Sequence, residues 1–222
     1  DVVLLHSGVS PEQVSQIYNI SKLDQGNNID SGLIAHYQFS GNANDSAGTN
    51  HGTVNGVGLT TDRFGNSEGA YRFDGDDSID VGSDDVQGNW SAAFWMHKDD
   101  VQKLASTLLN SSSYSLRVDQ WPSRNVIGYT EYGDTNYEIS YQLPSSEWIH
   151  LVYVGSSSGV VIYVNGEEVG RNPKSISCPL NIIGHHGGAN DAGYEGVIDD
   201  IRIYNRVLSE LEIQYLASDT AA

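Results

Sequence analysis

Hydrophobic and polar residues alternate in short runs along most of this 222-residue chain. In the segment 90–97 every second residue is apolar, and the segment 113–118 repeats that pattern. Successive side chains of a strand point to opposite faces, so a period of two predicts strands with one buried face. Strands are predicted at residues 33–39, 70–73, 78–81, 90–97, 113–118, 125–130, 137–141, 148–154, 160–164, 167–171, 181–184 and 197–203.

The clearest hairpin lies around Asn165-Gly166, between two apolar runs. Asn and Gly both accept a positive φ angle, and a two-residue turn of that kind matches the twist of the flanking strands. Residues 41–58 read instead as a long Gly/Asn/Asp loop with one short extended piece. Many short strands separated by polar turns predict an all-β fold built as a two-sheet antiparallel sandwich.

The last stretch of the chain, residues 193–217, reads as a strand, a turn and a short helix. Ser209 and Glu212 have the spacing of a capping box, in which the serine hydroxyl and the glutamate carboxylate satisfy free amides at the helix start. Leu211, Ile213 and Leu216 are predicted to press one face of this helix against the body of the protein.

This stretch closely resembles the closing motif of laminin-G-like, concanavalin A-like jelly-roll domains of the bacterial type. Segments 37–48 and 70–81 are similar to two earlier motifs of that family, in the same order. The resemblance implies an all-β, two-sheet antiparallel jelly-roll sandwich with one or two short helices, spanning residues 29–218. The fold serves lectins, adhesins, enzymes and spacers, so it leaves function open.

The first residues of the chain repeat its end. Residues 1–17 align with residues 200–216 without a gap, and Ser10 and Gln13 fall on the capping-box positions Ser209 and Glu212. Residues 1–28 are therefore predicted to be the tail of a preceding repeat followed by a linker, in a parent chain with neighbouring domains of the same kind. A chance similarity between two helix starts is the alternative.

Composition narrows the possible partners. The formal net charge is −18, which argues against nucleic acid and against anionic membrane surfaces, since both attract Lys and Arg. A single cysteine, Cys178, allows no intrachain disulfide, and no apolar run is long enough for membrane insertion. A secreted or cell-surface location is expected from the resemblance.

Catalysis is not expected. Glycoside hydrolases of the laminarinase type share this fold and carry a Glu-x-Asp-x-x-Glu strand, whereas Glu131, Asp134 and Glu138 do not have that spacing. A retaining glycosidase needs two carboxyl groups held about 5 Å apart. The paired residues His185 and His186 are more typical of satisfied or exposed histidines than of a metal pair.

Calcium is the predicted cofactor. The loop 41–51 offers many oxygen atoms, which Ca²⁺ prefers as ligands, and the first and last strands are expected to be neighbours. The family resemblance implies an acidic metal ligand in the closing strand, at the position of Asp199. The candidate ligands are Asp199, Asp45, Asp200, Asn42 and Asn50. The alternative is that Asp45 and Asn44 make Asx turns and that Asp199 or Asp200 pairs with an arginine such as Arg202 or Arg206.

Carbohydrate is the predicted partner, or else an extracellular matrix ligand. Aromatic rings stack on sugars, and Asn, Asp, His and Arg bind their hydroxyl groups; such residues gather in 121–141 and 185–194. The candidate ligand-binding residues are Trp121, Tyr129, Tyr132, Tyr137, His185, His186, Asn190 and Asp191. Ordinary packing of strand tyrosines is the alternative. The sequence thus predicts a non-catalytic carbohydrate-binding module, with an adhesin spacer repeat or an accessory domain of a polysaccharide-degrading enzyme as alternatives.

Overall fold

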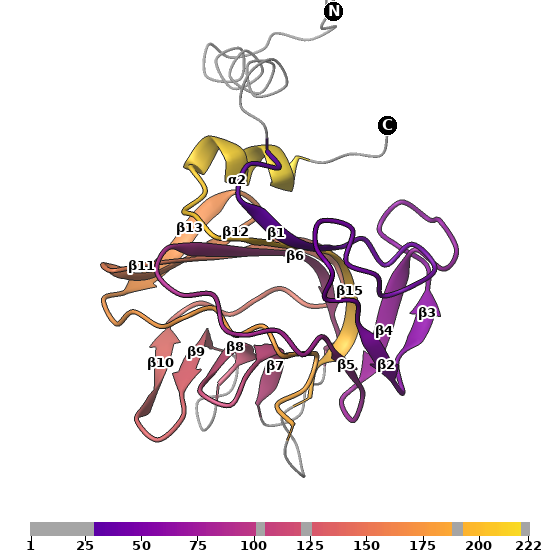
Figure 1. Ribbon diagram of the computed structural model, residues 1–222, viewed down its shortest axis with the longest axis horizontal. Coiled ribbons are helices and arrows are strands. Elements are labelled where there is room, and N and C mark those ends of the chain that lie inside the picture. Colours follow the sequence, from indigo (N-terminus) through magenta and orange to yellow (C-terminus); the bar gives the residue numbers. More distant parts are fainter. Residues whose placement is uncertain (1–28, 101–104, 121–125, 188–192, 219–222) are drawn as a thin grey trace, which may run out of the picture.

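The computed structural model describes residues 29–100, 105–120, 126–187 and 193–218. Two antiparallel sheets lie face to face, one stacked above the other, and a short helix covers one side of the sandwich (Figure 1). The predicted all-β sandwich is confirmed. The predicted repeat tail, residues 1–28, lies outside the described residues. None of the described helices has the length and apolar character needed to cross a membrane.

The larger sheet has eight strands in the order β13-β12-β11-β6-β15-β4-β3, and β1 pairs with β15. The first strand of the domain therefore lies beside the last one, as predicted. The strands of this sheet are β1 (Leu33–Tyr37), β3 (Gly58–Thr60), β4 (Ala70–Asp74), β6 (Trp90–Lys98), β11 (Trp148–Ser156), β12 (Gly159–Val164), β13 (Glu167–Asn172) and β15 (Glu195–Tyr204).

The smaller sheet has seven strands in the order β10-β9-β8-β7-β14-β5-β2. Its strands are β2 (Thr53–Asn55), β5 (Ser78–Asp80), β7 (Ser106–Asn110), β8 (Tyr114–Asp119), β9 (Ile127–Glu131), β10 (Thr135–Ile139) and β14 (Ile182–Ile183). The strand β7 was not predicted, because a bulge at Leu108 interrupts the alternation of its residues. The edge strands β2 and β3 have mostly exposed side chains and gave only a weak apolar pattern.

The apolar residues that the alternating pattern predicted to face inward fill the space between the two sheets. Trp90, Phe94 and Met96 on β6 are fully buried. The indole N–H of Trp90 donates to the carbonyl of Ile176 at 2.8 Å, so even its polar atom is satisfied. Gly155 lies directly against this ring: a Cβ atom there would fall 2.1 Å from Trp90 Cε2. The absence of a side chain at Gly155 is what lets the indole lie flat on β11.

The hairpin between β12 and β13 turns at Asn165 and Gly166, with φ angles of 50° and 86°, as the sequence predicted. Two positive φ values fit the turn type that Asn-Gly favours. The side chain of Asn165 also accepts a hydrogen bond of 2.8 Å from the backbone N–H of His150. The turn is thereby tied to the neighbouring strand β11.

The helix α2 (Glu210–Ala217) begins at the predicted capping box. Ser209 accepts from the N–H of Glu212, and the Glu212 carboxylate accepts from the N–H of Ser209 at 2.8 Å. Ile213 and Leu216 are buried against the eight-stranded sheet. The prediction for Leu211 was wrong: it is 38% exposed. Two residues apart on a helix is more than half a turn, so Leu211 cannot share the face of Ile213.

Candidate functional site

The outer face of the seven-stranded sheet is polar although it is buried. On β8, Leu116 and Val118 point into the core, so Ser115 and Arg117 point to the opposite face. Ser115 is fully buried and Arg117 is only 6% exposed. Residues on a face of the sheet that was open to solvent would instead be exposed. Polar side chains thus form the outer side of the central strands, and little of their surface is exposed.

The bulge in β7 adds residues to this surface. Thr107 is paired with Arg117 and Asn110 with Ser115, while the register shifts between Thr107 and Leu109. Cross-strand partners share a face of the sheet, so Thr107 and Asn110 lie beside the β8 residues. The extra residue is Leu108, whose insertion lets the two polar side chains reach one face while Leu109 stays in the core. We call Thr107, Asn110, Ser115, Arg117, Thr130 and Tyr132 the polar face.

A chain of side-chain hydrogen bonds crosses the polar face. The guanidinium of Arg117 donates from Nε to Ser115 at 2.8 Å and from Nη2 to the Tyr132 hydroxyl at 3.3 Å. That hydroxyl donates to Asn110 Oδ1 at 2.6 Å. Asn110 Nδ2 in turn donates to the carbonyl of His186 at 3.0 Å. Each member fixes the orientation of the next, so the donors and acceptors are held in place before any ligand arrives.

A second group of contacts continues the surface toward the sheet edge. Thr130 donates to Asn136 Oδ1 at 2.7 Å and to Gln120 Oε1 at 3.3 Å. Within the described ranges, Gln120 Nε2 and Thr107 Oγ1 are buried and have no hydrogen-bond partner. Leaving such a group unsatisfied costs about 1–3 kcal/mol. Two unsatisfied groups beside one ordered network are typical of a place where a ligand or water completes the bonding.

Two of the predicted ligand-binding residues lie on or beside this surface, namely Tyr132 and His186. The imidazole of His185 contacts that of His186, with ring centroids 5.7 Å apart. Burial, followed by the charge of Arg117, lowers the pKa of His186. The effect of the Arg117 charge indicates that the His186 imidazole lies near the Arg117 guanidinium.

The other predicted ligand-binding residues are elsewhere. Tyr129 is fully buried in the core between the sheets, and its hydroxyl donates to the carbonyl of Lys174 at 2.5 Å. Alternation along β9 turns this tyrosine into the core. Tyr137 packs on it, with ring centroids 5.0 Å apart. The remaining candidates, Trp121, Asn190 and Asp191, lie outside the described residues.

Sequence reasoning missed the residues at the centre of the polar face: Asn110, Thr107 and Arg117. Arg117 stands between Leu116 and Val118 in a segment that was predicted as a strand. Its outward position was therefore readable from the alternation. Asn110 and Thr107 gave no such signal, because the bulge of β7 hides the period of two.

The loop predicted to hold calcium is organised by Asp45. This buried carboxylate accepts hydrogen bonds from the backbone N–H groups of His36 at 2.9 Å, Ala47 at 3.0 Å, Gly48 at 2.9 Å and Asn50 at 3.3 Å. It ties the loop to β1 by charge-assisted bonds. Asn42 caps a turn by accepting from the N–H of Asn44 at 2.9 Å. These are the Asx-turn contacts of the alternative interpretation.

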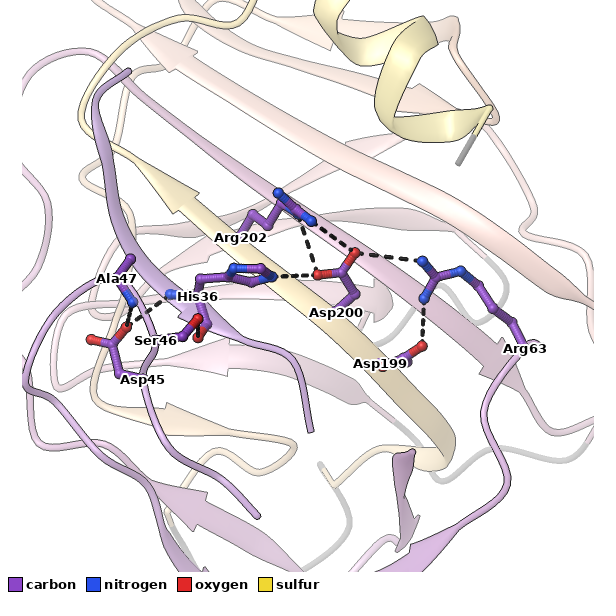
Figure 2. A network of polar contacts seen from close by, with 8 residues as sticks. All are labelled: His36, Asp45, Ser46, Ala47, Arg63, Asp199, Asp200 and Arg202. Carbon is purple, nitrogen blue, oxygen red and sulfur yellow. Dashed lines mark hydrogen bonds and ion pairs between the residues drawn. The ribbon is translucent and has the colours of Figure 1, made fainter. Parts of the chain in front are cut away.

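The closing strand places its two aspartates in an ion-pair cluster (Figure 2). Asp199 Oδ2 lies 2.5 Å from Arg63 Nη1, and Asp200 Oδ2 lies 3.5 Å from Arg63 Nη2. Asp200 Oδ1 is 2.6 Å from His36 Nε2 and 3.3 Å from Arg202 Nε. A bulge between Asp199 and Arg202 produces this arrangement, with Asp200 in the left-handed region at a φ of 45°.

The two carboxyl groups of the cluster titrate in opposite directions. Burial raises the pKa of Asp199 to about 7, and Arg63 offsets this only in part. Burial also acts on Asp200, yet the hydrogen bond from His36 and the charge of Arg202 outweigh it and lower the pKa to about 2. Asp200 is thus the permanent anion to which the cluster's cations are drawn.

N–H groups, arginines and a histidine contact the oxygens of these carboxylates, so a calcium ion would have to displace some of those contacts. No group of three or more His, Cys, Asp or Glu in the part of the chain that the structure describes is arranged to hold a metal. Asn50 Nδ2 donates to Ser83 at 3.2 Å. Calcium binding stays a prediction.

A shallow cavity of about 270 Å³ lies beside the Asp199–Asp200 cluster. Asp62, Phe64 and Asn66 are among the residues that line it.

The acidic residues considered for catalysis share one lysine. Lys174 Nζ lies 3.0 Å from Glu131 and 3.2 Å from Asp134. Hydrogen bonds from the Lys174 ammonium to these two carboxylates raise its pKa. Glu138 is exposed on β10, one strand away from them. Glu131 and Asp134 therefore tie the β9–β10 hairpin to Lys174, and Glu138 takes no part in this ion-pair group.

Comparison with known proteins agrees with the fold. Residues 73–214 match the profile of the concanavalin A-like lectin/glucanases superfamily. The chain belongs to this superfamily. The match spans more than half of the chain and includes the polar face, Asp199, Asp200 and the first part of helix α2. No curated protein matches the chain in a sequence search.

Solved structures of similar shape come from several kinds of protein. Domain 4 of AbnA, a GH43 extracellular arabinanase from Geobacillus stearothermophilus in complex with arabinotriose, has a TM-score of 0.68 at 19% identity. The match covers 84% of this chain and 98% of that domain.

Two further neighbours are longer proteins. The binding domain of Paraclostridial Mosquitocidal Protein 1 has a TM-score of 0.67 at 16% identity, with 86% of this chain and 52% of that chain covered. Trypanosoma rangeli sialidase in complex with 2,3-difluorosialic acid has a TM-score of 0.62 at 13% identity, with coverage of 91% and 38%. This chain thus spans about half or less of either protein. At such identities the likeness establishes the fold alone.

Proposed function

We propose that the chain is a non-catalytic carbohydrate-binding module and that the polar face is its binding surface. The observation that carries the proposal is the ordered chain Arg117–Tyr132–Asn110, which lies beside two buried groups that have no partner among the described residues. Saccharides present many hydroxyl groups that both donate and accept hydrogen bonds. A fixed set of amide, hydroxyl and guanidinium groups matches that chemistry at low entropic cost.

The neighbours support the same proposal. One is a domain of an extracellular arabinanase solved with arabinotriose, and another is described as the binding domain of a toxin. A secreted or cell-surface parent, in which this module brings a larger protein to its glycan, is consistent with both. A spacer repeat of an adhesin remains the second candidate.

The absence of catalysis is part of the proposal. Glu131 and Asp134 both pair with Lys174, which supports a role in surface ion pairing rather than as the two carboxyl groups of a glycosidase. Release of reducing ends from any polysaccharide, lost in Glu131→Gln, would contradict this part.

A glycan array tests the binding proposal. Wild-type protein is expected to bind a defined set of saccharides, and the double variant Asn110→Ala/Tyr132→Phe is expected to lose that binding. The matched control is Arg171→Ala, whose exposed side chain pairs with Glu168 on the other sheet. Binding that survives in the double variant would move the site elsewhere. No binding by the wild type would favour the spacer.

A further inference from the structure

Arg117 is a buried cation on a strongly acidic protein, yet among the residues that the structure describes it has no carboxylate partner. Its hydrogen bonds go to two neutral hydroxyl groups, and its guanidinium lies 5.9 Å from the centre of the Tyr132 ring. Over the described residues no Asp or Glu lies within ion-pair distance of it. The chain has 29 acidic and 11 basic residues, so carboxylates were available in excess.

Two other buried cations among the described residues have a carboxylate partner, which sets Arg117 apart from them. Lys98 lies 3.4 Å from Asp119, and Arg63 lies 2.5 Å from Asp199. Burying a charge is costly unless a counter-charge or strong hydrogen bonds compensate. Arg117, at 6% exposure, has the burial of these residues without their compensation.

The position of Arg117 is fixed rather than adaptable. Ser115 holds Nε, Tyr132 holds Nη2, and Tyr132 is itself held by Asn110 at 2.6 Å. A planar guanidinium binds a carboxylate through two parallel N–H groups. Thr107, directly across the strand pair, adds a buried hydroxyl for which the described residues supply no partner.

Resting on the proposed function, we infer that the polar face selects acidic saccharides and that Arg117 binds their carboxylate. The ligand class is a uronate- or sialate-bearing oligosaccharide. Arg117 supplies the counter-charge, and the ligand carboxylate completes the neutralisation that the protein leaves open. Tyr132 and Asn110 then bind hydroxyl groups of the same sugar or its neighbour.

One acidic residue, Glu138, lies on the same face of the sheet. Its charge would repel an acidic saccharide, so a substitution there supplies a control. Glu138 is paired with Gly128, which is paired with Arg117, so Glu138 lies two strands away. Two strand spacings are about 10 Å, too far for an ion pair but near enough for repulsion of an anionic ligand. Glu138→Gln is therefore expected to tighten acidic ligands about two- to threefold.

The test is a titration of the full chain with matched pairs of probes. The acidic probes are trigalacturonate, trimannuronate and 3′-sialyllactose, and their neutral counterparts are the two methyl-esterified trimers and lactose. At least one acidic probe is expected to bind tenfold or more tightly than its counterpart. Arg117→Gln is expected to abolish that preference, and Arg117→Lys to retain part of it.

A measurement on the wild type guards against a variant that does not fold. The affinity for the acidic probe is expected to fall several-fold between about 20 mM and 500 mM NaCl, while the neutral probe is unaffected. Equal binding of both members of every pair, or array binding of neutral glycans alone, would overturn the inference and leave the proposed function intact. Absence of binding to any saccharide would overturn both.

Discussion

The hydroxyl of Tyr132 donates a 2.6 Å hydrogen bond to Oδ1 of Asn110, joining the end of β9 to the end of β7 across the intervening strand β8. The same hydroxyl accepts from Arg117, so one oxygen orders three side chains. These hydrogen bonds fix the geometry of the polar face, and removal of the Tyr132 hydroxyl oxygen alone would break both of them.

Tyr132→Phe removes that atom and keeps the ring. We expect the free energy of unfolding to fall by about 0.5–1.5 kcal/mol, as for a typical buried hydrogen bond, and glycan affinity to fall as well. The control is Tyr137→Phe, whose hydroxyl bonds to Asp134 on the exposed hairpin. Denaturant unfolding and array binding of both variants check the prediction. Equal effects of the two substitutions would contradict it.

Gly155→Ala is expected to destabilise the core. The new methyl group would lie 2.1 Å from the Trp90 indole, which is fully buried and cannot move without losing its hydrogen bond to Ile176. Overpacking of this kind costs about 1–3 kcal/mol. Gly58→Ala is the control, since nothing lies within 4 Å of its added Cβ and its φ is not positive. Thermal melting distinguishes the two; an unchanged Tm for Gly155→Ala would refute the packing account.

Stability is expected to depend on pH through His150. Burial lowers the pKa of this histidine to about 3, while the unfolded chain titrates near 6.5. The unfolded state therefore binds more protons between these values, so stability is lost as the pH falls through that window, at up to about 1.4 kcal/mol per pH unit. Urea unfolding of His150→Gln should show a flatter slope from pH 6.5 to 4. The exposed His51 supplies the control, and identical slopes in His150→Gln and wild type would disprove the assignment.

The calcium prediction has a direct test in the melting temperature. For a calcium ion to bind Asp199, that carboxylate has to exchange Arg63 for the metal, and Asp45 has to give up backbone N–H groups. These contacts favour a melting temperature that does not respond to chelator. A fall on adding chelator, restored by calcium but poorly by magnesium, would instead establish the site. Asp199→Asn should then abolish the response, while Asp84→Asn should not.

The sequence predicted the fold well because its signals are local. Alternation located the core strand β6, Asn165-Gly166 defined a hairpin, and Ser209 with Glu212 defined the start of α2. Residues that depend on distant partners were harder to interpret. Asp199 has the pattern of a metal ligand, and only the tertiary structure shows that Arg63, 136 residues away, already neutralises it.

The candidate site was only partly predictable for the same reason. Tyr132 and His186 were named from composition, whereas Tyr129 was named alongside them although alternation turns it inward. Asn110 joins Tyr132 only because a bulge shifts the register of β7, and no residue pattern announces that bulge. Amino-acid composition thus pointed to the region around Tyr132 and His186, and the strand register shows which other residues lie beside them.

Backbone amide chemical-shift mapping with the saccharide that gives the strongest array signal tests carbohydrate binding at the polar face most directly. The predicted result is saturable shifts concentrated at 107–117 and 128–132, on β7, β8 and the end of β9, with little change on β12 and β13. Shifts confined to the eight-stranded sheet or to the Asp199–Arg63 cluster would contradict this assignment, as would no saturable shift with any saccharide.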